Sequence, residues 1–230
     1  MKIDRNRPLP AHTKYKYEEC FAKIILEHLF PQRYIDLKIE DRPDLQDLKH
    51  QIGVEVTSAV PPEDREASSL WTSTVYMDDG SQKKRNIDRL EQLGVHYTGG
   101  VQMWPSQSYQ TDSLEESPYW TLIQAFDGKI QKLNQGHYVE LRQYDLFVHS
   151  ELFIWPQEAE LQLARLLQEM SLRNGHGRHF TNVYLLGICA LYKWRLEDNR
   201  YELIPLTSSD FLRYGWDARE LVIQKEEMMI

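Results

Sequence analysis

Two short segments, Arg42-Pro43-Asp44-Leu45 and Gly53-Val54-Glu55-Val56-Thr57, decide how this chain is interpreted. The second alternates like a half-buried strand, so its two valines point to a core while Glu55 and Thr57 point to the opposite face. Asp44 lies at the turn of the preceding arm. Two carboxylates on neighbouring arms can together bind a hard divalent cation, which prefers oxygen ligands. The pair therefore indicates a metal site.

Hydrophobic periodicity predicts the elements around these segments. Apolar residues at helical spacing predict helices, and alternating or continuous apolar runs predict strands. The expected order is a helix over 15–29, strands at 34–40, 44–46 and 52–60, a helix over 119–133, a strand over 144–154, a helix over 157–172, and strands at 183–194 and 200–206.

The stretch at about 61–117 differs in composition from its flanks. It begins at a Pro-Pro pair, is rich in polar residues, and carries two helical patterns, around 67–75 and 85–93, before a loop over 99–117 that contains Gly, Pro, Ser and Gln. A chain of 230 residues is long enough for one substantial core. We therefore expect residues 1–230 to form a single domain with an insertion at about 61–117.

The pattern of Pro43-Asp44 followed by Glu55-x-Thr57 resembles the signature of the PD-(D/E)XK nuclease superfamily, which is Pro-Asp, a variable gap, and then an acidic residue, any residue and lysine. The order of a helix, three strands, a helix and a strand over most of residues 15–150 is similar to the core of that superfamily. The resemblance implies an α/β fold with a restriction-endonuclease-like core, in which helices flank a central mixed β-sheet and a polar helical and loop insertion is added.

The resemblance also implies roles for individual residues. Asp44 and Glu55 match the acidic residues that bind Mg²⁺ or Mn²⁺. Many members add a glutamate from the first helix, and Glu18 is the first choice here because it lies three and seven residues before two large apolar side chains, with Glu19 as the fallback.

Thr57 stands where the superfamily has its lysine, and a hydroxyl group cannot replace an ammonium that orients water and balances phosphate charge. In some relatives the following helix supplies this lysine. Lys129 and Lys132 lie on the helix predicted after the insertion, and Lys129 is the preferred candidate. For either lysine, the alternative is a surface side chain whose stem covers apolar surface.

The implied function is metal-dependent hydrolysis of phosphodiester bonds in DNA or RNA, with Mg²⁺ or Mn²⁺ activating water and Lys129 positioning it. The alternative is a catalytically inactive nuclease-like fold, without the signature lysine, that acts as a protein-interaction or nucleic-acid-sensing module. Metal binding and cleavage separate the two hypotheses.

Composition and charge argue against some other classes of protein function. The net charge of −8 argues against a protein that coats nucleic acid, although nucleic acid remains the expected partner because phosphate contacts depend on local basic groups. The strongest basic patch, Lys83-Lys84-Arg85 with Arg89, is more typical of a solvated helix face than of a nucleic-acid contact. The glycines lack a nucleotide-binding pattern, so an NTPase is not indicated.

Cys20 and Cys189 have no partner at zinc-ligand spacing and are expected to be buried free thiols. No apolar run approaches the length of a membrane span, and the first ten residues lack an apolar signal region. We therefore expect a cytoplasmic protein that does not enter membranes. The sequence does not indicate an oligomeric state.

Overall fold

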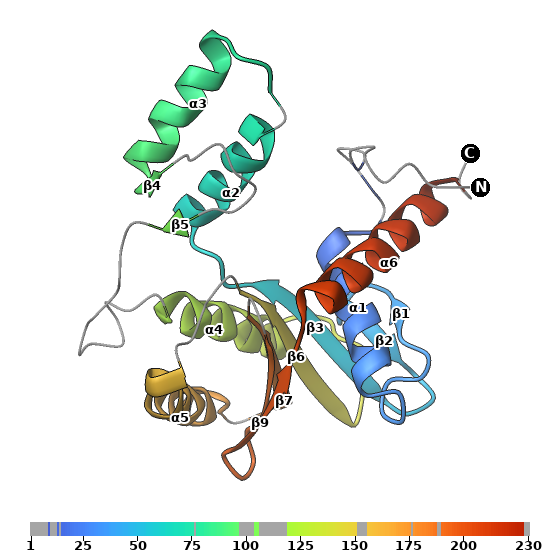
Figure 1. Cartoon of the computed structure of the whole chain (residues 1–230). Coiled ribbons are helices and arrows are strands. Elements are labelled where there is room, and N and C mark those ends of the chain that lie inside the picture. Colours follow the sequence, from blue (N-terminus) through green and yellow to red (C-terminus); the bar gives the residue numbers. More distant parts are fainter. Residues whose placement is uncertain are drawn as a thin grey trace. The chain divides into compact units, whose positions relative to one another are not determined.

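The computed structural model describes Leu9, Thr13 and residues 15–75, 77–96, 104–105, 119–150, 156–175, 177–187 and 190–227 (Figure 1). Contacts between residues divide the chain into two compact units. The first combines residues 1–59 with 122–230, and the second covers 60–121, nearly the span expected for the insertion.

The first unit is an α/β structure built on a seven-stranded mixed sheet. Its strand order is β1-β2-β3-β6-β7-β8-β9, with β3, β6 and β7 parallel and the remaining neighbours antiparallel. The strands are β1 Lys38–Ile39, β2 Leu45–Asp47, β3 Ile52–Ser58, β6 Gln143–His149, β7 Phe180–Leu186, β8 Ala190–Arg195 and β9 Arg200–Pro205. This confirms the predicted α/β class.

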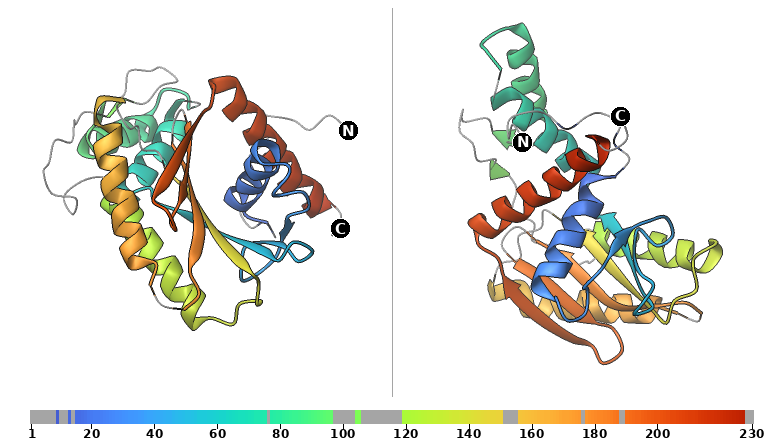
Figure 2. Two further views of the ribbon diagram at one scale, coloured as in Figure 1. Left: turned by 90° about the horizontal axis from the view of Figure 1, so that it is seen from below. Right: turned by 90° about the vertical axis from the view of Figure 1, so that its right-hand side faces the viewer.

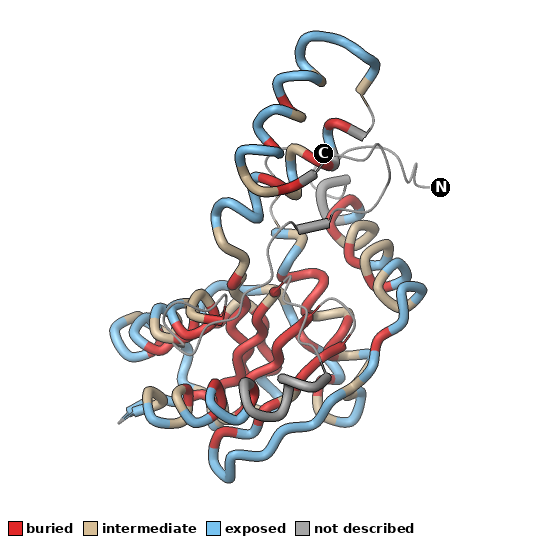
Figure 3. The backbone as a smooth tube through the Cα atoms, turned by 60° about the vertical axis from the view of Figure 1, so that its left-hand side comes forward, coloured by how far each residue is buried: buried red, intermediate tan, exposed pale blue. Residues whose placement is uncertain are grey.

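Helices cover both faces of the sheet, as the two views of Figure 2 show. One face is covered by α1 and α6 and the other by α4 and α5. Their bounds are α1 Tyr17–Leu29, α4 Trp120–Gln135, α5 Pro156–Arg173 and α6 Ser208–Glu227. The central strands are buried from both sides (Figure 3), which explains their nearly continuous apolar sequences.

The second unit has a small core of its own. It contains α2 Pro62–Val75, α3 Ser81–Gln92, and the short antiparallel pair β4 Val95–His96 and β5 Trp104–Pro105. The buried residues shared by these elements are Ala67, Trp71, Leu90 and Val95. Both helices begin earlier than the sequence predicted. Most of the loop predicted over 99–117 lies outside the described residues.

Two other expectations need correction. The strand predicted at 183–194 is a hairpin of β7 and β8, closed by a hydrogen bond from the Gly187 amide to the Ala190 carbonyl. A continuous apolar run does not reveal a reversal when both arms are buried. The strand predicted at 34–40 pairs only at Lys38 and Ile39, and Ile35 is exposed because turns precede the pairing.

Helix α6 was not predicted, although its sequence carries two helix signals. Thr207 and Asp210 form a reciprocal cap, in which the Asp210 amide donates to Thr207 Oγ1 at 3.2 Å and the Thr207 amide donates to Asp210 Oδ2 at 2.9 Å. Tyr214, Ala218 and Val222 then recur every four residues and are buried in the same core cluster as the inner residues of α1. Cys20, expected to be buried, lies in that core, and Cys189 lies outside the described residues.

A fully buried carboxylate, Asp145 on β6, joins the strands on the α1 face. It accepts hydrogen bonds from the Tyr34 hydroxyl at 2.6 Å, from Arg33 Nη2 at 3.0 Å and from Gln143 Nε2 at 2.9 Å. The amide and side chain of Asn182 on β7 also donate to it, at 3.0 and 2.7 Å. Its oxygens thus satisfy donors from two strands and the segment after α1.

Replacing Asp145 with Asn should lower the free energy of unfolding by about 3 kcal/mol or more, because an amide turns one acceptor into a donor and leaves Arg33 without its buried counter-charge. Denaturant unfolding measures this. The exposed Asp36 provides the control, since Asp36→Asn should change stability by no more than about 0.5 kcal/mol. Equal effects of the two substitutions would contradict a structural role for Asp145.

Candidate active site

Glu55 lies in the middle of β3 and points to the α4 face of the sheet. Its neighbours Val54 and Val56 are buried in the apolar cluster beneath α1, so strand alternation places Glu55 on the opposite side. Glu55 is only 2% exposed. Its carboxylate is therefore held near the centre of the sheet, where its partners determine its chemistry.

Asp44 is placed beside Glu55 by the pairing of β2 with β3. The register aligns Leu45 with Val54, so the position before β2 lies opposite Glu55. The Val56 amide donates a hydrogen bond to Asp44 Oδ2 at 2.7 Å, which ties this carboxylate to β3. Gly53 makes the approach possible, because a Cβ there would collide with the Pro43 ring and lie 2.8 Å from Leu141 Cδ1.

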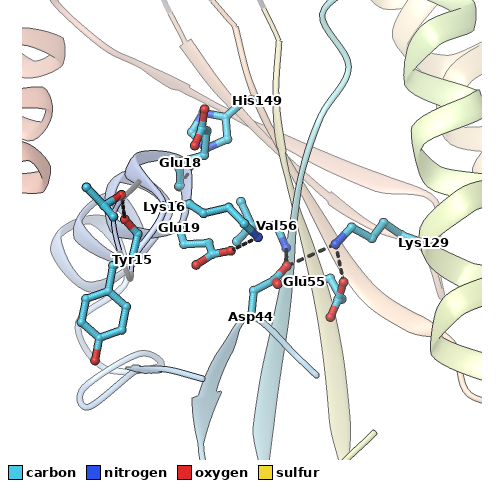
Figure 4. A network of polar contacts seen from close by, with 10 residues as sticks. Tyr15, Lys16, Glu18, Glu19, Asp44, Glu55, Val56, Lys129 and His149 are labelled. Atoms are coloured by element: carbon cyan, nitrogen blue, oxygen red, sulfur yellow. Dashed lines mark hydrogen bonds and ion pairs between the residues drawn. The ribbon is translucent and has the colours of Figure 1, made fainter. Parts of the chain in front are cut away.

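The ammonium of Lys129 on α4 lies between the two carboxylates. Its Nζ is 3.2 Å from Asp44 Oδ2 and 2.5 Å from Glu55 Oε2, as Figure 4 shows. On α4 the residues Phe126, Ile130 and Leu133 are buried against the sheet, which leaves Lys129 at the margin of the apolar stripe. Of the two candidate lysines, the structure brings Lys129 to both acids.

Thr57 follows Glu55 by two residues on the same face of β3 and is partly exposed. The cation at the two carboxylates is supplied by Lys129 on α4 and not by the residue at position 57.

The first helix contributes Glu19 rather than Glu18 to this region. Glu18 is exposed and its carbonyl oxygen contacts His149 Nε2 at 3.0 Å, whereas the Glu19 side chain is buried and pairs with Lys16 Nζ at 2.8 Å. Asp44 acts electrostatically on both Glu19 and Lys16. Small residues lie between the large apolar residues of α1, and the side of the helix that carries these small residues faces inward. Glu19 lies on that side and therefore faces inward.

The site therefore holds three carboxylates and two ammonium groups in alternation, as Figure 4 shows. The order is Glu19, Lys16, Asp44, Lys129 and Glu55. Alternation lowers the repulsion between like charges in a partly buried region.

The electrostatics of the site keep Lys129 charged and make Glu55 a weaker acid. Burial raises the pKa of Glu55, and the nearby Asp44 raises it further, while Lys129 lowers it without cancelling the increase. Burial alone would lower the pKa of Lys129, but the two carboxylates outweigh it and raise that pKa.

A polar pocket of about 440 Å³ opens over these residues. Sequence reasoning missed some residues that line it. Tyr138, in the segment after α4, acts on Glu55 as a hydrogen-bond donor and lowers its pKa. No local pattern indicated Tyr138 or Lys16, because each approaches from an element distant in sequence. The lining consists of Lys16, Asp41, Arg42, Asp44, Glu55, Lys129, Lys132, Gln135, Gly136 and Tyr138.

Comparison of the chain with protein-family models, curated proteins and solved structures gives no match. Within the described residues, no cluster of three or more His, Cys, Asp or Glu side chains has the geometry of a metal site. A search of the same part of the chain finds no helix with both the length and the hydrophobicity needed to cross a membrane.

Replacing Lys129 with Met should raise the pKa of Glu55 further, because the substitution removes the cation that lowers it. The folded protein then binds the Glu55 proton more tightly than the unfolded chain does. Lowering the pH therefore stabilises the folded state, and raising the pH through the raised pKa of Glu55 removes this stabilisation. Carboxyl-carbon NMR titration of both proteins, with Glu55→Gln to assign the resonance, measures the shift. An unchanged titration would exclude the contact between Lys129 and Glu55 in solution.

Proposed function

We propose that the protein is a metal-dependent nuclease with a restriction-endonuclease-like, PD-(D/E)XK core. The observation that carries the proposal is the single ammonium of Lys129 lying 3.2 Å and 2.5 Å from carboxylates of Asp44 and Glu55, which come from neighbouring strands. The order α1, β1, β2, β3, α4, β6, with β3 and β6 parallel, is also the order expected of such a core.

The two carboxylates are suited to Mg²⁺ or Mn²⁺. Mg²⁺ is commonly bound by one or two carboxylates, with water and substrate phosphates as its other ligands. Asp44 and Glu55 supply the hard oxygen ligands that this ion prefers, and both carboxylates contact the Lys129 ammonium, which marks a place that accepts positive charge.

The proposed reaction is hydrolysis of a phosphodiester bond by water. A bound divalent ion would lower the pKa of a coordinated water and neutralise charge on the phosphate. Asp44 and Glu55 would hold the ion, and the Asp44 carboxylate is kept in place by the Val56 amide. Lys129 orients the attacking water and offsets the negative charge that develops on the phosphate, while Thr57 lacks a group able to act as a base.

The competing hypothesis is an inactive nuclease-like module, favoured by the threonine at position 57. The position of Lys129 fits both hypotheses, because a lysine between two buried carboxylates balances their charge whether or not the site is catalytic. A protein that neither binds metal nor cleaves nucleic acid would support this alternative.

The direct test replaces Glu55 with Gln, which keeps size and polarity but removes a ligand charge. Wild-type protein should cleave labelled DNA or RNA in Mg²⁺ or Mn²⁺ and not in EDTA, and Glu55→Gln should reduce the cleavage rate by about a hundred- to a thousandfold. Glu18→Gln is the matched control and should cleave like wild type, since Glu18 is exposed beside the site. Equal rates for all three proteins would reject the proposal.

A second test separates the role of Lys129 from that of the metal ligands. Lys129→Met should abolish cleavage yet strengthen Mn²⁺ binding by about tenfold, because it removes a positive charge next to both carboxylates. Calorimetric titration with Mn²⁺ measures the affinity, and Lys49→Met, at the exposed β2–β3 turn, is the control. Weaker Mn²⁺ binding by Lys129→Met would show that the lysine supports the carboxylates rather than the chemistry.

A further inference from the structure

The pocket does not share the net negative charge of the whole chain, which is −8. Its lining has four cations, Lys16, Arg42, Lys129 and Lys132, against the three carboxylates Asp41, Asp44 and Glu55, and Glu19 pairs with Lys16 beside it. A charge-balanced site on an acidic protein repels a phosphate less than the rest of the surface does. Arg42 pairs with Asp41 at 3.6 Å, but both side chains are exposed, and an exposed ion pair is weak, so a phosphate can compete for the arginine.

One wall of the pocket is a row of polar side chains on α4. Lys129, Lys132 and Gln135 are spaced three residues apart and all line the pocket. At a rise of 1.5 Å per residue, the row extends for about 9 Å along the helix. That length exceeds one phosphate group. Lys132 therefore lies where it can reach the phosphate next to the one held at Lys129.

Arg42 also lines the pocket and holds a backbone conformation that favours glycine. Its φ is +57°, in the left-handed region, which costs an L residue energy that glycine does not lose. Its carbonyl accepts a hydrogen bond from the Val139 amide at 3.2 Å, which ties this turn to the segment after α4. This backbone contact fixes Arg42 at the pocket.

Lys16 completes the cationic rim on the α1 side. Its side chain is 72% exposed, and its ammonium lies on the other side of Asp44 from Lys129, as Figure 4 shows. Cations are thus present on both flanks of the two carboxylates. A single phosphate bound at the carboxylates would contact only the nearest of these cations.

We propose that this rim binds the backbone of a single nucleic-acid strand, with Arg42 and Lys132 contacting the phosphates on either side of the reacting one. The identity of the reacting phosphate rests on the proposed function, but strand binding does not require cleavage. The pocket volume of about 440 Å³ is on the scale of a small-molecule site and accommodates one nucleotide rather than a duplex. Contacts to phosphate are independent of base sequence.

The experiment measures binding without cleavage. Wild-type protein in EDTA is titrated into labelled single-stranded DNA and RNA of about 12 nucleotides, at salt concentrations from about 50 to 200 mM, and anisotropy gives Kd at each. Arg42→Gln and Lys132→Gln should each weaken binding several-fold and reduce the slope of log Kd against log salt by about 0.7, the value for one phosphate contact on a single strand. Lys49→Gln, at the exposed turn outside the pocket, should bind like wild type.

Two further measurements keep the result interpretable. Arg42→Gly should lose the same affinity while its thermal midpoint stays equal to or above that of wild type, because glycine accepts the left-handed conformation without strain. This separates loss of binding from loss of folding. A hairpin duplex of the same sequence should bind more weakly than the single strand.

The proposal is overturned if neither nucleic acid binds, if the salt slopes of Arg42→Gln and Lys132→Gln equal that of wild type, or if the duplex binds as well as the single strand. Its failure is distinct from failure of the proposed function. Binding with the expected slopes but no cleavage in Mg²⁺ or Mn²⁺ would support the strand-binding rim and reject the nuclease. Cleavage that is unaffected by Arg42→Gln and Lys132→Gln would support the nuclease and reject the strand-binding rim.

Discussion

The close contact of the Pro43-Asp44 turn with β3 is the constraint on which the site depends. Gly53 has no side chain, so Pro43 can pack directly over the strand, and the Val56 amide then reaches the Asp44 carboxylate at 2.7 Å. A slip of one residue in this pairing would turn Asp44 to the apolar face, since alternate residues of a strand point to opposite sides. The hydrogen bond and the packing of Pro43 both oppose such a slip.

Charge balance explains how the site tolerates its burial. Asp44 and Glu55 repel each other, and burial raises the pKa of Glu55. Lys129 lies between them, and Lys16 balances Glu19 on the far side of Asp44. Lys129 supplies this positive charge from α4. Both faces of the sheet are mainly apolar, and each carries one buried polar cluster. Asp145 with Arg33 and Tyr34 lies on the α1 face, and Glu55 with Lys129 lies on the α4 face.

Local sequence predicted the parts of the fold that depend on short-range geometry. The alternation of β3 and the stripe of α4 could be recognised because each element repeats its pattern within a few turns or residues. The proximity of Asp44 and Glu55 was predictable because a hairpin register links them across a short separation. The reversal between β7 and β8 was not, since both arms are buried and equally apolar.

The sequence by itself therefore determined the α/β class, the strand that carries Glu55 and the pair of carboxylates, because hydrophobic period and hairpin pairing act between near neighbours. Only the tertiary structure decided which helix glutamate turns inward, which lysine of α4 meets the acids, and that Lys16 and Tyr138 join the same pocket. The rotation of α1 depends on its packing against α6 and the sheet, and Lys129 and Glu55 are 74 residues apart in sequence. Contacts of this kind are set by how whole elements pack, and no local pattern records them.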